Sequence, residues 1–217
     1  MIGTCMRLKN PENNFKFTDW GFHFCETIKN DLEDSICGFH APIVDIGTSN
    51  NNFGIEKLKN IIDSIPNADY LTIHLHNGLK PDYDTLLNNV SELTDYAKKS
   101  NIVLCIENLR YGFSANPENV INIADFTDCD ITFDIGHVCY EKRQEYVDIF
   151  SDRIYNVHVY ELENETGHVA PKDLKNLTPI LDKLLNVGAN QWLIELMDIG
   201  EIKHTELLLH KYIKEHK

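Results

Sequence analysis

Residues 102–108 read Ile-Val-Leu-Cys-Ile-Glu-Asn, a short apolar run that ends in an acid and an amide. A continuous apolar run of this length is typical of a strand that is buried on both faces, as in a parallel sheet. Glu107 would then stand at the carboxyl end of that strand. Residues 131–134 and 192–196 repeat the pattern, because each apolar run there also ends in or near an acid.

Short β-rich runs of this kind alternate along the chain with longer segments of helical period, which predicts parallel βα units. The eight candidate strands are Ile2–Met6, His23–Ile28, Ile36–His40, Tyr70–His76, Val103–Glu107, Ile131–Asp134, Tyr155–Val159 and Trp192–Leu196. Apolar residues spaced mostly three or four apart predict helices within residues 55–65, 83–97, 174–185 and 201–217.

The expected fold is an α/β protein with a compact (β/α)8 TIM barrel, formed by one domain over residues 1–217. Residues 7–21 show only a weak helical pattern, and residues 30–35 allow about one or two turns. The first helices should therefore be short or irregular. Asn116-Pro117-Glu118 predicts the start of a helix, and Gly188 predicts the end of another.

Composition and charge limit the partners. The formal net charge is −14 and the pI is about 5.0, which disfavours a nucleic-acid partner because like charges repel. No apolar run is long enough to predict a membrane span. The six cysteines are scattered without a C-x-x-C pair, which indicates reduced thiols and a cytoplasmic location. The sequence is compatible with a homo-oligomer and does not decide the oligomeric state.

Ionisable residues fall at the end of nearly every candidate strand. Those of strands three to eight are His40, His76, Glu107, Asp134, His158 and Glu195. In a parallel barrel, the carboxyl ends of all strands meet at one mouth. Carboxylates crowded together there repel one another unless a cation lies between them. A donor set of oxygen and nitrogen without cysteine favours Mn²⁺, Mg²⁺, Co²⁺ or Zn²⁺, so the sequence predicts a divalent metal ion at the mouth.

Each of these residues taken alone also has an ordinary structural explanation. Asp134 and His137 could form a turn, and His158 could be a buried core histidine. Arg110, just after Glu107, could bind an anionic substrate or be a solvated surface residue. The ordered set of residues, rather than any single one, favours a functional site.

Five short sequence motifs occur in order at these strand ends. They are Phe39-His40-Ala41-Pro42, Ile106-Glu107-Asn108, Phe133-Asp134-Ile135-Gly136-His137, Asn156-Val157-His158-Val159 and Leu193-Ile194-Glu195. Together they resemble the xylose-isomerase-like barrel superfamily, over residues 25–196. This superfamily includes sugar and sugar-phosphate isomerases and epimerases, and also the AP endonucleases of DNA repair. Because one barrel supports many reactions, the resemblance implies the fold more closely than the activity.

The resemblance also implies roles for single residues. The residues that match the metal ligands of the ketose 3-epimerases are Glu107, Asp134, His158 and Glu195. In that branch the two glutamates also form the catalytic acid/base pair, and His137 matches a histidine that contacts substrate oxygen. The residues that match histidines binding additional zinc ions in the AP endonucleases are His40, His76 and His137.

Within this comparison, His76 matches better than His74, which is expected to lie in a second shell or in the core. The endonucleases also carry an Asp-x-His pair after strand seven. His168 matches the histidine of that pair, but Thr166 stands where the aspartate would be. The sequence therefore argues against a complete three-zinc site, and leaves His168 as a candidate for further metal or substrate binding.

The expected function is that of a metal-dependent isomerase or epimerase acting on a sugar or sugar phosphate, by proton transfer through an enediolate. The alternatives are a metal-dependent hydrolase or phosphoesterase of the AP endonuclease type, and a non-catalytic barrel. An isomerase should show one metal site flanked by two opposed glutamates. A hydrolase should show two or three sites, with bridged ions about 4 Å apart.

Overall fold

The computed structural model describes residues 2–5, 17–21, 37–48, 52–76 and 78–216. Its main sheet is a closed barrel with the strand order β1-β10-β7-β6-β5-β4-β3-β2. These strands are β1 Ile2–Cys5, β2 Phe17–Gly21, β3 Gly38–His40, β4 Tyr70–Ile73, β5 Val103–Glu107, β6 Asp130–Asp134, β7 Ile154–Val159 and β10 Trp192–Ile194. All pairings are parallel, and β1 closes the ring by pairing with both β10 and β2. The predicted TIM barrel is thus confirmed.

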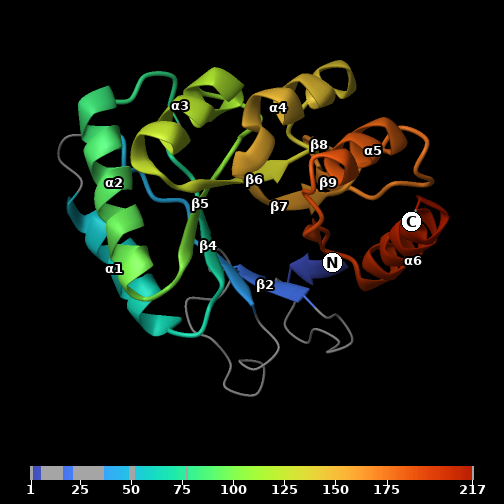
Figure 1. Cartoon of the computed structure of the whole chain (residues 1–217), viewed down its shortest axis with the longest axis horizontal. Helices are drawn as coiled ribbons and strands as arrows, with labels where there is room; N and C mark the ends of the chain where they lie inside the picture. Colours follow the sequence, from blue (N-terminus) through green and yellow to red (C-terminus); the bar gives the residue numbers. More distant parts are fainter. Residues whose placement is uncertain (1, 6–16, 22–36, 49–51, 77, 217) are drawn as a thin grey trace.

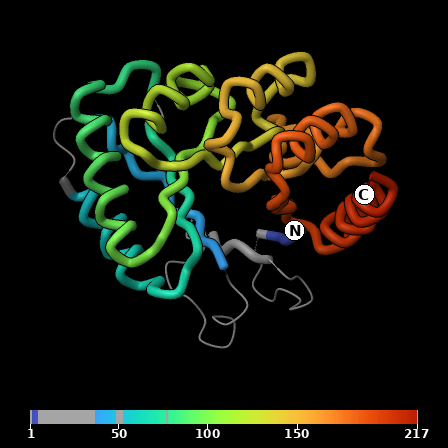
Figure 2. The backbone as a smooth tube through the Cα atoms, viewed as in Figure 1, coloured from blue at the N-terminus to red at the C-terminus, as the bar shows by residue number. Residues whose placement is uncertain are grey.

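Helices lie outside the barrel (Figure 1). They are α1 Asn52–Ser64, α2 Tyr83–Lys99, α3 Pro117–Thr127, α4 Arg143–Phe150, α5 Thr178–Asn186 and α6 Ile199–His216. From α1 to α5, each helix contacts the next along the chain, as the tube in Figure 2 shows. α6 packs against β1 and β10, so the first strand and the last helix lie side by side. Among the described residues, no helix is long and apolar enough to cross a membrane.

Two predicted helix ends are confirmed. Asn116 caps α3, because its side chain accepts a hydrogen bond from the Glu118 amide at 3.1 Å, and Pro117 follows at the first helical position. Gly188 follows α5 with φ +80°, the left-handed conformation that glycine adopts without strain.

The second strand was predicted in the wrong place. The range His23–Ile28 lies outside the described residues, and the position between β1 and β3 is occupied by β2, which pairs with both. The expected irregular helix over residues 7–21 is therefore wrong at its end, because residues 17–21 form a strand. Residues 7–16 and 30–35, where the short first helices were expected, are not described.

A second correction concerns the loop after β7. Residues 162–169 form a two-stranded antiparallel sheet, β8 Leu162–Asn164 and β9 Gly167–Val169. Its turn is local in origin, because the Asn164 side chain accepts hydrogen bonds from the Thr166 amide and hydroxyl at 2.8 and 2.6 Å. Gly167 supplies the positive φ of +109° that the turn requires.

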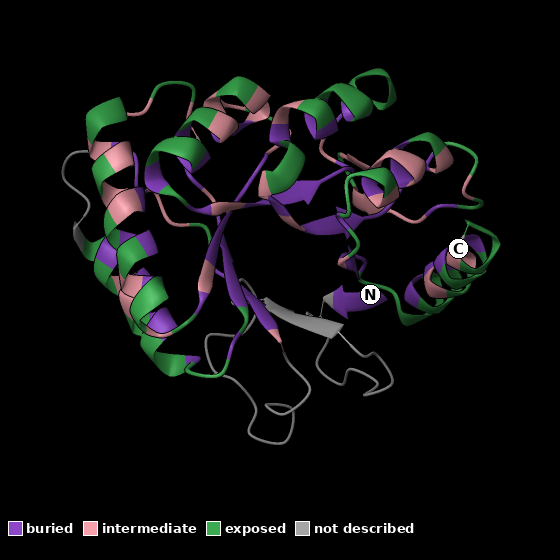
Figure 3. Ribbon diagram, in the orientation of Figure 1, coloured by how far each residue is buried: buried purple, intermediate pink, exposed green. Residues whose placement is uncertain are grey.

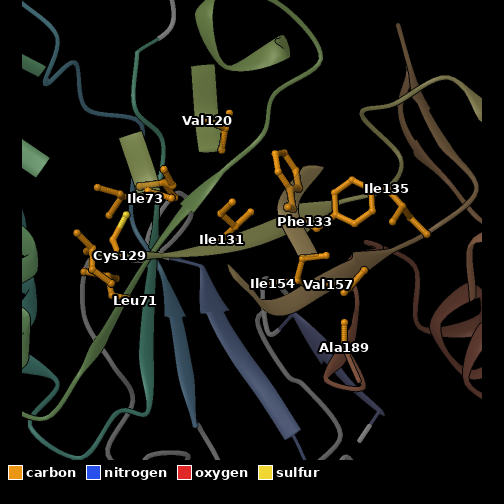
Figure 4. Packing of buried hydrophobic residues seen from close by; sticks show 14 of the residues in the cluster. Leu71, Ile73, Val120, Cys129, Ile131, Phe133, Ile135, Ile154, Val157 and Ala189 are labelled. Carbon is orange, nitrogen blue, oxygen red and sulfur yellow. The ribbon is translucent and has the colours of Figure 1, made fainter. Parts of the chain in front are cut away.

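Outward-facing strand residues pack against the helices. Phe133 of β6, for example, meets the rings of Tyr146 and Phe150 in α4 at centroid distances of 6.2 and 5.6 Å. Figure 4 shows part of this layer, with Ile131 and Phe133 of β6 and Val120 of α3. The described strands are mostly buried, whereas the outer faces of the helices are exposed (Figure 3). The hydrophobic core therefore lies between barrel and helices.

The barrel interior is less apolar. Tyr70, Cys105 and Leu193 form a separate small cluster. Farther along the strands, polar side chains from three strands meet. The Thr72 hydroxyl lies 2.7 Å from that of Thr132, and the Asn156 amide donates to the Thr132 hydroxyl at 3.1 Å. The lining thus becomes polar toward the carboxyl ends of the strands.

Candidate metal centre

Side chains two positions apart on a strand point to the same face. Two positions beyond five of the interior residues named above stands an ionisable one. These pairs are Thr72 and His74, Cys105 and Glu107, Thr132 and Asp134, Asn156 and His158, and Leu193 and Glu195. The strand alternation, continued by one residue past β4 and β10, therefore brings five ionisable side chains to the mouth of the barrel.

Four of the predicted ligands form one group, called here the central group: Glu107, Asp134, His158 and Glu195. One ligand atom from each lies within 4.8 Å of the others, and all four residues are at most 3% exposed. His158 Nδ1 lies 3.0 Å from a Glu107 oxygen, 2.9 Å from Glu195 and 3.7 Å from Asp134. Yet neither His158 ring nitrogen has a partner in hydrogen-bond geometry within the described residues. Atoms gathered around a common point in this way suit a cation with ligands at about 2.0–2.2 Å.

A second group consists of His40, His74 and Glu107. His74 Nε2 lies 2.7 Å from Glu107 Oε2, and His40 Nε2 lies 3.0 Å from the same oxygen. The other carboxylate oxygen, Oε1, faces His158 in the central group. Glu107 is therefore shared between two groups, one oxygen on each side.

An outer group consists of His137, Glu163 and His168. His137 Nε2 lies 3.4 Å from Glu163 Oε2. Glu163 and His168 are register partners across the β8–β9 hairpin, so the hairpin itself brings them together. All three residues are partly exposed, in contrast to the central group.

Three histidines have their orientation fixed by the backbone. Nδ1 of His40 lies 2.9 Å from the Ala41 carbonyl, and Nδ1 of His137 lies 2.8 Å from the Asn108 carbonyl. In the same way, His168 Nδ1 lies 2.7 Å from the Glu195 carbonyl. A carbonyl only accepts, so Nδ1 carries the proton in each case and Nε2 is left to face its group. Metal-binding histidines are held in this way, so these residues fit a divalent ion.

The Asp134 carboxylate is held by its neighbours. Tyr160 donates its hydroxyl to Oδ2 at 3.0 Å, and the amides of Gly136 and His137 donate to Oδ1 at 2.8 and 3.0 Å. The Asn108 side chain bonds both the amide and the carbonyl of Asp134 at 2.8 and 2.9 Å, which ties β5 to β6. These contacts fix the carboxylate before any ligand binds.

Tyr160 also reaches the outer group. Its ring stacks on His168 with a centroid distance of 4.1 Å and an interplanar angle of 12°. It passes so close to Gly136 that a Cβ there would lie 2.0 Å from a ring carbon. Tyr160 therefore touches members of both groups, and position 136 has room only for glycine.

The charges of the site shift the pKa values of its members. Burial raises the pKa of the Glu107 carboxyl, but the imidazoles of His40 and His158 outweigh it and hold that pKa well below its usual range. Burial lowers the pKa of the His158 imidazole, but the carboxylates of Glu195, Asp134 and Glu107 raise it well above its ordinary value. In His74, burial dominates and lowers the pKa. The centre thus attracts positive charge strongly.

The structure places His74, rather than His76, in the second group, and the role of His76 as a ligand stays a prediction. β4 ends at Ile73, so His74 follows the strand directly, whereas His76 lies three residues past its end. His76 instead turns to Asp45, with Nδ1 2.9 Å from the carboxylate. Glu163 was not predicted as a site residue, because the hairpin that places it opposite His168 was not predicted either. Its signal was the turn sequence Asn164-Glu165-Thr166-Gly167.

Residues 16–201 match the family model described as xylose isomerase-like TIM barrel. The chain belongs to this family. Within the xylose isomerase-like TIM barrel family, the uncharacterized protein MJ0008 of Methanocaldococcus jannaschii is 50% identical over 99% of this chain and 96% of its own length. A second protein of that organism, MJ1614, is 28% identical over 58% of this chain and 56% of its own.

Solved structures share the fold at low identity. A D-tagatose 3-epimerase-like protein superposes with a TM-score of 0.78 at 19% identity, covering 98% of this chain and 97% of its own. An L-ribulose 3-epimerase superposes with a TM-score of 0.74 at 12% identity, covering 94% of this chain and 86% of its own. A xylose isomerase-like TIM barrel protein from Mycobacterium smegmatis, in complex with magnesium, superposes with a TM-score of 0.66 at 16% identity, covering 91% of this chain and 84% of its own.

Proposed function

We propose that this member of the family is a metal-dependent hydrolase that cleaves a phosphate ester and holds more than one divalent ion. The observation that carries the proposal is the position of Glu107, with one oxygen in the central group and the other in the second group. Shared carboxylates of this kind suit paired ions about 3.5–4 Å apart, which are common in phosphatases and nucleases. The outer group adds a third candidate site that the sequence had argued against.

Ions bound at these groups would supply positive charge for the phosphoryl oxygens and would acidify a water molecule. The residues that would hold them are His40, His74, Glu107, Asp134, His137, His158, Glu163, His168 and Glu195. In the hydrolysis, water forms a new P–O bond, the ester P–O bond breaks, and the leaving alkoxide takes a proton. The low pKa of Glu107 keeps it ionised, which suits it to hold cations rather than to donate protons. Glu195, 3% exposed at the same centre, is our candidate to accept the proton from the attacking water.

A small substrate fits better than DNA. The net charge of −14 opposes a polyanionic backbone. The solved relatives named as 3-epimerases act, by their names, on sugars. We therefore propose a small phosphorylated molecule such as a sugar phosphate as the substrate class.

A sugar isomerase or epimerase is the second candidate, and one observation favours it. Glu107 and Glu195 approach His158 from two different strands, at 3.0 and 2.9 Å, as an acid/base pair around one central ion requires. That candidate leaves the second and outer groups without a function, whereas hydrolysis uses all three.

Metal content separates the two candidates. The protein is purified without chelators or a His-tag, and its metals are measured in molar ratio to the chain. Hydrolysis predicts two or three ions per chain and phosphate release from aryl and sugar phosphates. This activity should be lost in Glu107→Gln but kept in Glu165→Gln, a control at an exposed position. One ion per chain, with interconversion in a ketose and aldose panel, replaces it with the second candidate. No bound metal after soaking refutes both.

A further inference from the structure

A pocket of about 500 Å³ borders the outer group. His137 and Glu163 form part of its wall, and three cationic side chains also line it: Arg110, Lys142 and Arg143. Such a volume suits a small molecule. We call this space, which these five residues help to line, the anion pocket. Its excess of positive charge contrasts with the net charge of −14 for the chain.

Arg143 stands at the start of α4 and is only 1% exposed. Its Nε donates to the Val138 carbonyl at 2.9 Å, and its Nη2 donates to the Glu161 carbonyl. Its third nitrogen, Nη1, is buried without a hydrogen-bond partner among the described residues. The Tyr140 ring lies 4.3 Å from this guanidinium. A ring does not replace a hydrogen-bond acceptor, and a buried charged donor without one is costly, so an anion that reached Nη1 would be stabilised.

Arg110 and Lys142 add charge from two other elements. Arg110 follows β5, is half-buried, and stacks its guanidinium over the Tyr111 ring at 4.8 Å. Lys142 ends the short 3-10 helix η3 Tyr140–Lys142 and is exposed. Neither forms an ion pair with a carboxylate in the part of the chain that the structure describes. Both charges are therefore available to an anion in the pocket.

We propose that the anion pocket binds a phosphate group of the substrate that lies beyond the reacting bond. The enzyme would then select small molecules with a second anionic group. Because His137 and Glu163 belong both to the pocket wall and to the outer group, a ligand bound here would contact the outer group at one end. A planar guanidinium binds phosphate through paired hydrogen bonds, which suits both arginines to this task. The choice of substrate class rests on the proposed function, but binding at the pocket can be tested without it.

The test is titration of the chelator-treated protein with inorganic phosphate, followed by calorimetry and by amide chemical shifts. We expect saturable binding whose Kd rises about tenfold or more in Arg110→Ala and in Lys142→Ala. Lys172→Ala, an exposed lysine outside the pocket, should change Kd by less than about twofold. Before the chelator treatment, the metal content of all three variants should equal that of the wild type.

Two results would overturn the pocket assignment: no phosphate binding by the wild type, or equal affinity in wild type, Arg110→Ala and Lys142→Ala. Kinetics then separate the two proposals. Phosphate binding weakened by these variants, in a protein that hydrolyses no ester, supports the pocket and refutes the hydrolase. Hydrolysis with the same KM for substrates with and without a second phosphate supports the hydrolase and refutes the pocket.

Discussion

Replacing Glu107 by glutamine tests whether one carboxylate serves two ions. Its Oε1 lies 3.0 Å from His158, and its Oε2 lies 3.0 and 2.7 Å from His40 and His74. Glutamine has nearly the same shape, but it is neutral and offers one oxygen. At least one group must then face an NH₂ donor, and both lose the negative charge that attracts a cation. We expect Glu107→Gln to weaken binding of two ions, not one.

The size of the effect follows from linkage. An ion present at about 100 times its Kd stabilises the folded chain by about 2.7 kcal/mol, so two ions contribute about 5 kcal/mol. For a chain of this size that raises Tm by roughly 10–20 °C. A loss of about 100-fold in affinity at both sites, or about 2.7 kcal/mol each, removes nearly all of this gain at the same metal concentration.

The assay is thermal unfolding with and without Mn²⁺ or Zn²⁺, combined with elemental analysis of the dialysed protein. Glu195→Gln is the matched control, because Glu195 belongs to the central group alone. We expect it to lose one ion and about half of the thermal shift. If Glu107→Gln keeps the wild-type metal content, or loses no more than Glu195→Gln does, the shared role of Glu107 is refuted.

Three further changes test the surroundings of the site. Tyr160→Phe should weaken metal binding about 10- to 100-fold in a chelator competition. It should also lower the free energy of unfolding in urea by about 1–1.5 kcal/mol. Unchanged metal affinity would show that the Tyr160 hydroxyl does not hold Asp134 in place for the metal. Gly136→Ala should lower the free energy of unfolding by about 2 kcal/mol or more, because the new Cβ meets the Tyr160 ring. Gly200→Ala, at the exposed start of α6, should lower it by less than about 0.5 kcal/mol. Similar losses in the two variants would contradict the close packing of Gly136 against Tyr160. Burial raises the pKa of the Asp45 carboxyl, but hydrogen bonds from His76 and from the Gly47 amide outweigh burial and lower that pKa below its ordinary value. The ionised Asp45 therefore contributes to the free energy of unfolding above its pKa in the unfolded chain. This contribution is lost as the pH falls through its pKa in the folded chain. Asp45→Asn should thus reduce stability at pH 7 more than at pH 2.5, and an equal loss at both would show that the pair is not involved.

Much of the central group could be predicted from sequence because its position follows from strand alternation alone. Glu107 ends an apolar run, and β5 then carries it into the barrel interior. The same logic applied to Asp134, His158 and Glu195. Their roles as ligands stay predictions, but the structure brings them together as expected.

The remaining features depend on where a strand stops or how a loop folds. His76 was preferred to His74 because of its resemblance to the endonuclease histidine, but it lies past the end of β4 and contacts Asp45, whereas His74 contacts Glu107. Glu163 meets His168 only through pairing of the hairpin. β2 was missed because the short strand follows a polar stretch of weak helical pattern. In each case the deciding interaction joins residues whose pairing local periodicity does not specify.

The hairpin has a consequence for how such centres evolve. The central and second groups stand on strands or at their ends, where any shift would disturb the whole barrel. The outer group takes two of its three residues from the β8–β9 hairpin, which forms a sheet of its own. A short insertion or deletion after β7 could therefore add or remove one site without changing the barrel framework. Within this family, the length and turn sequence of that one segment should distinguish chains with the outer site from chains without it.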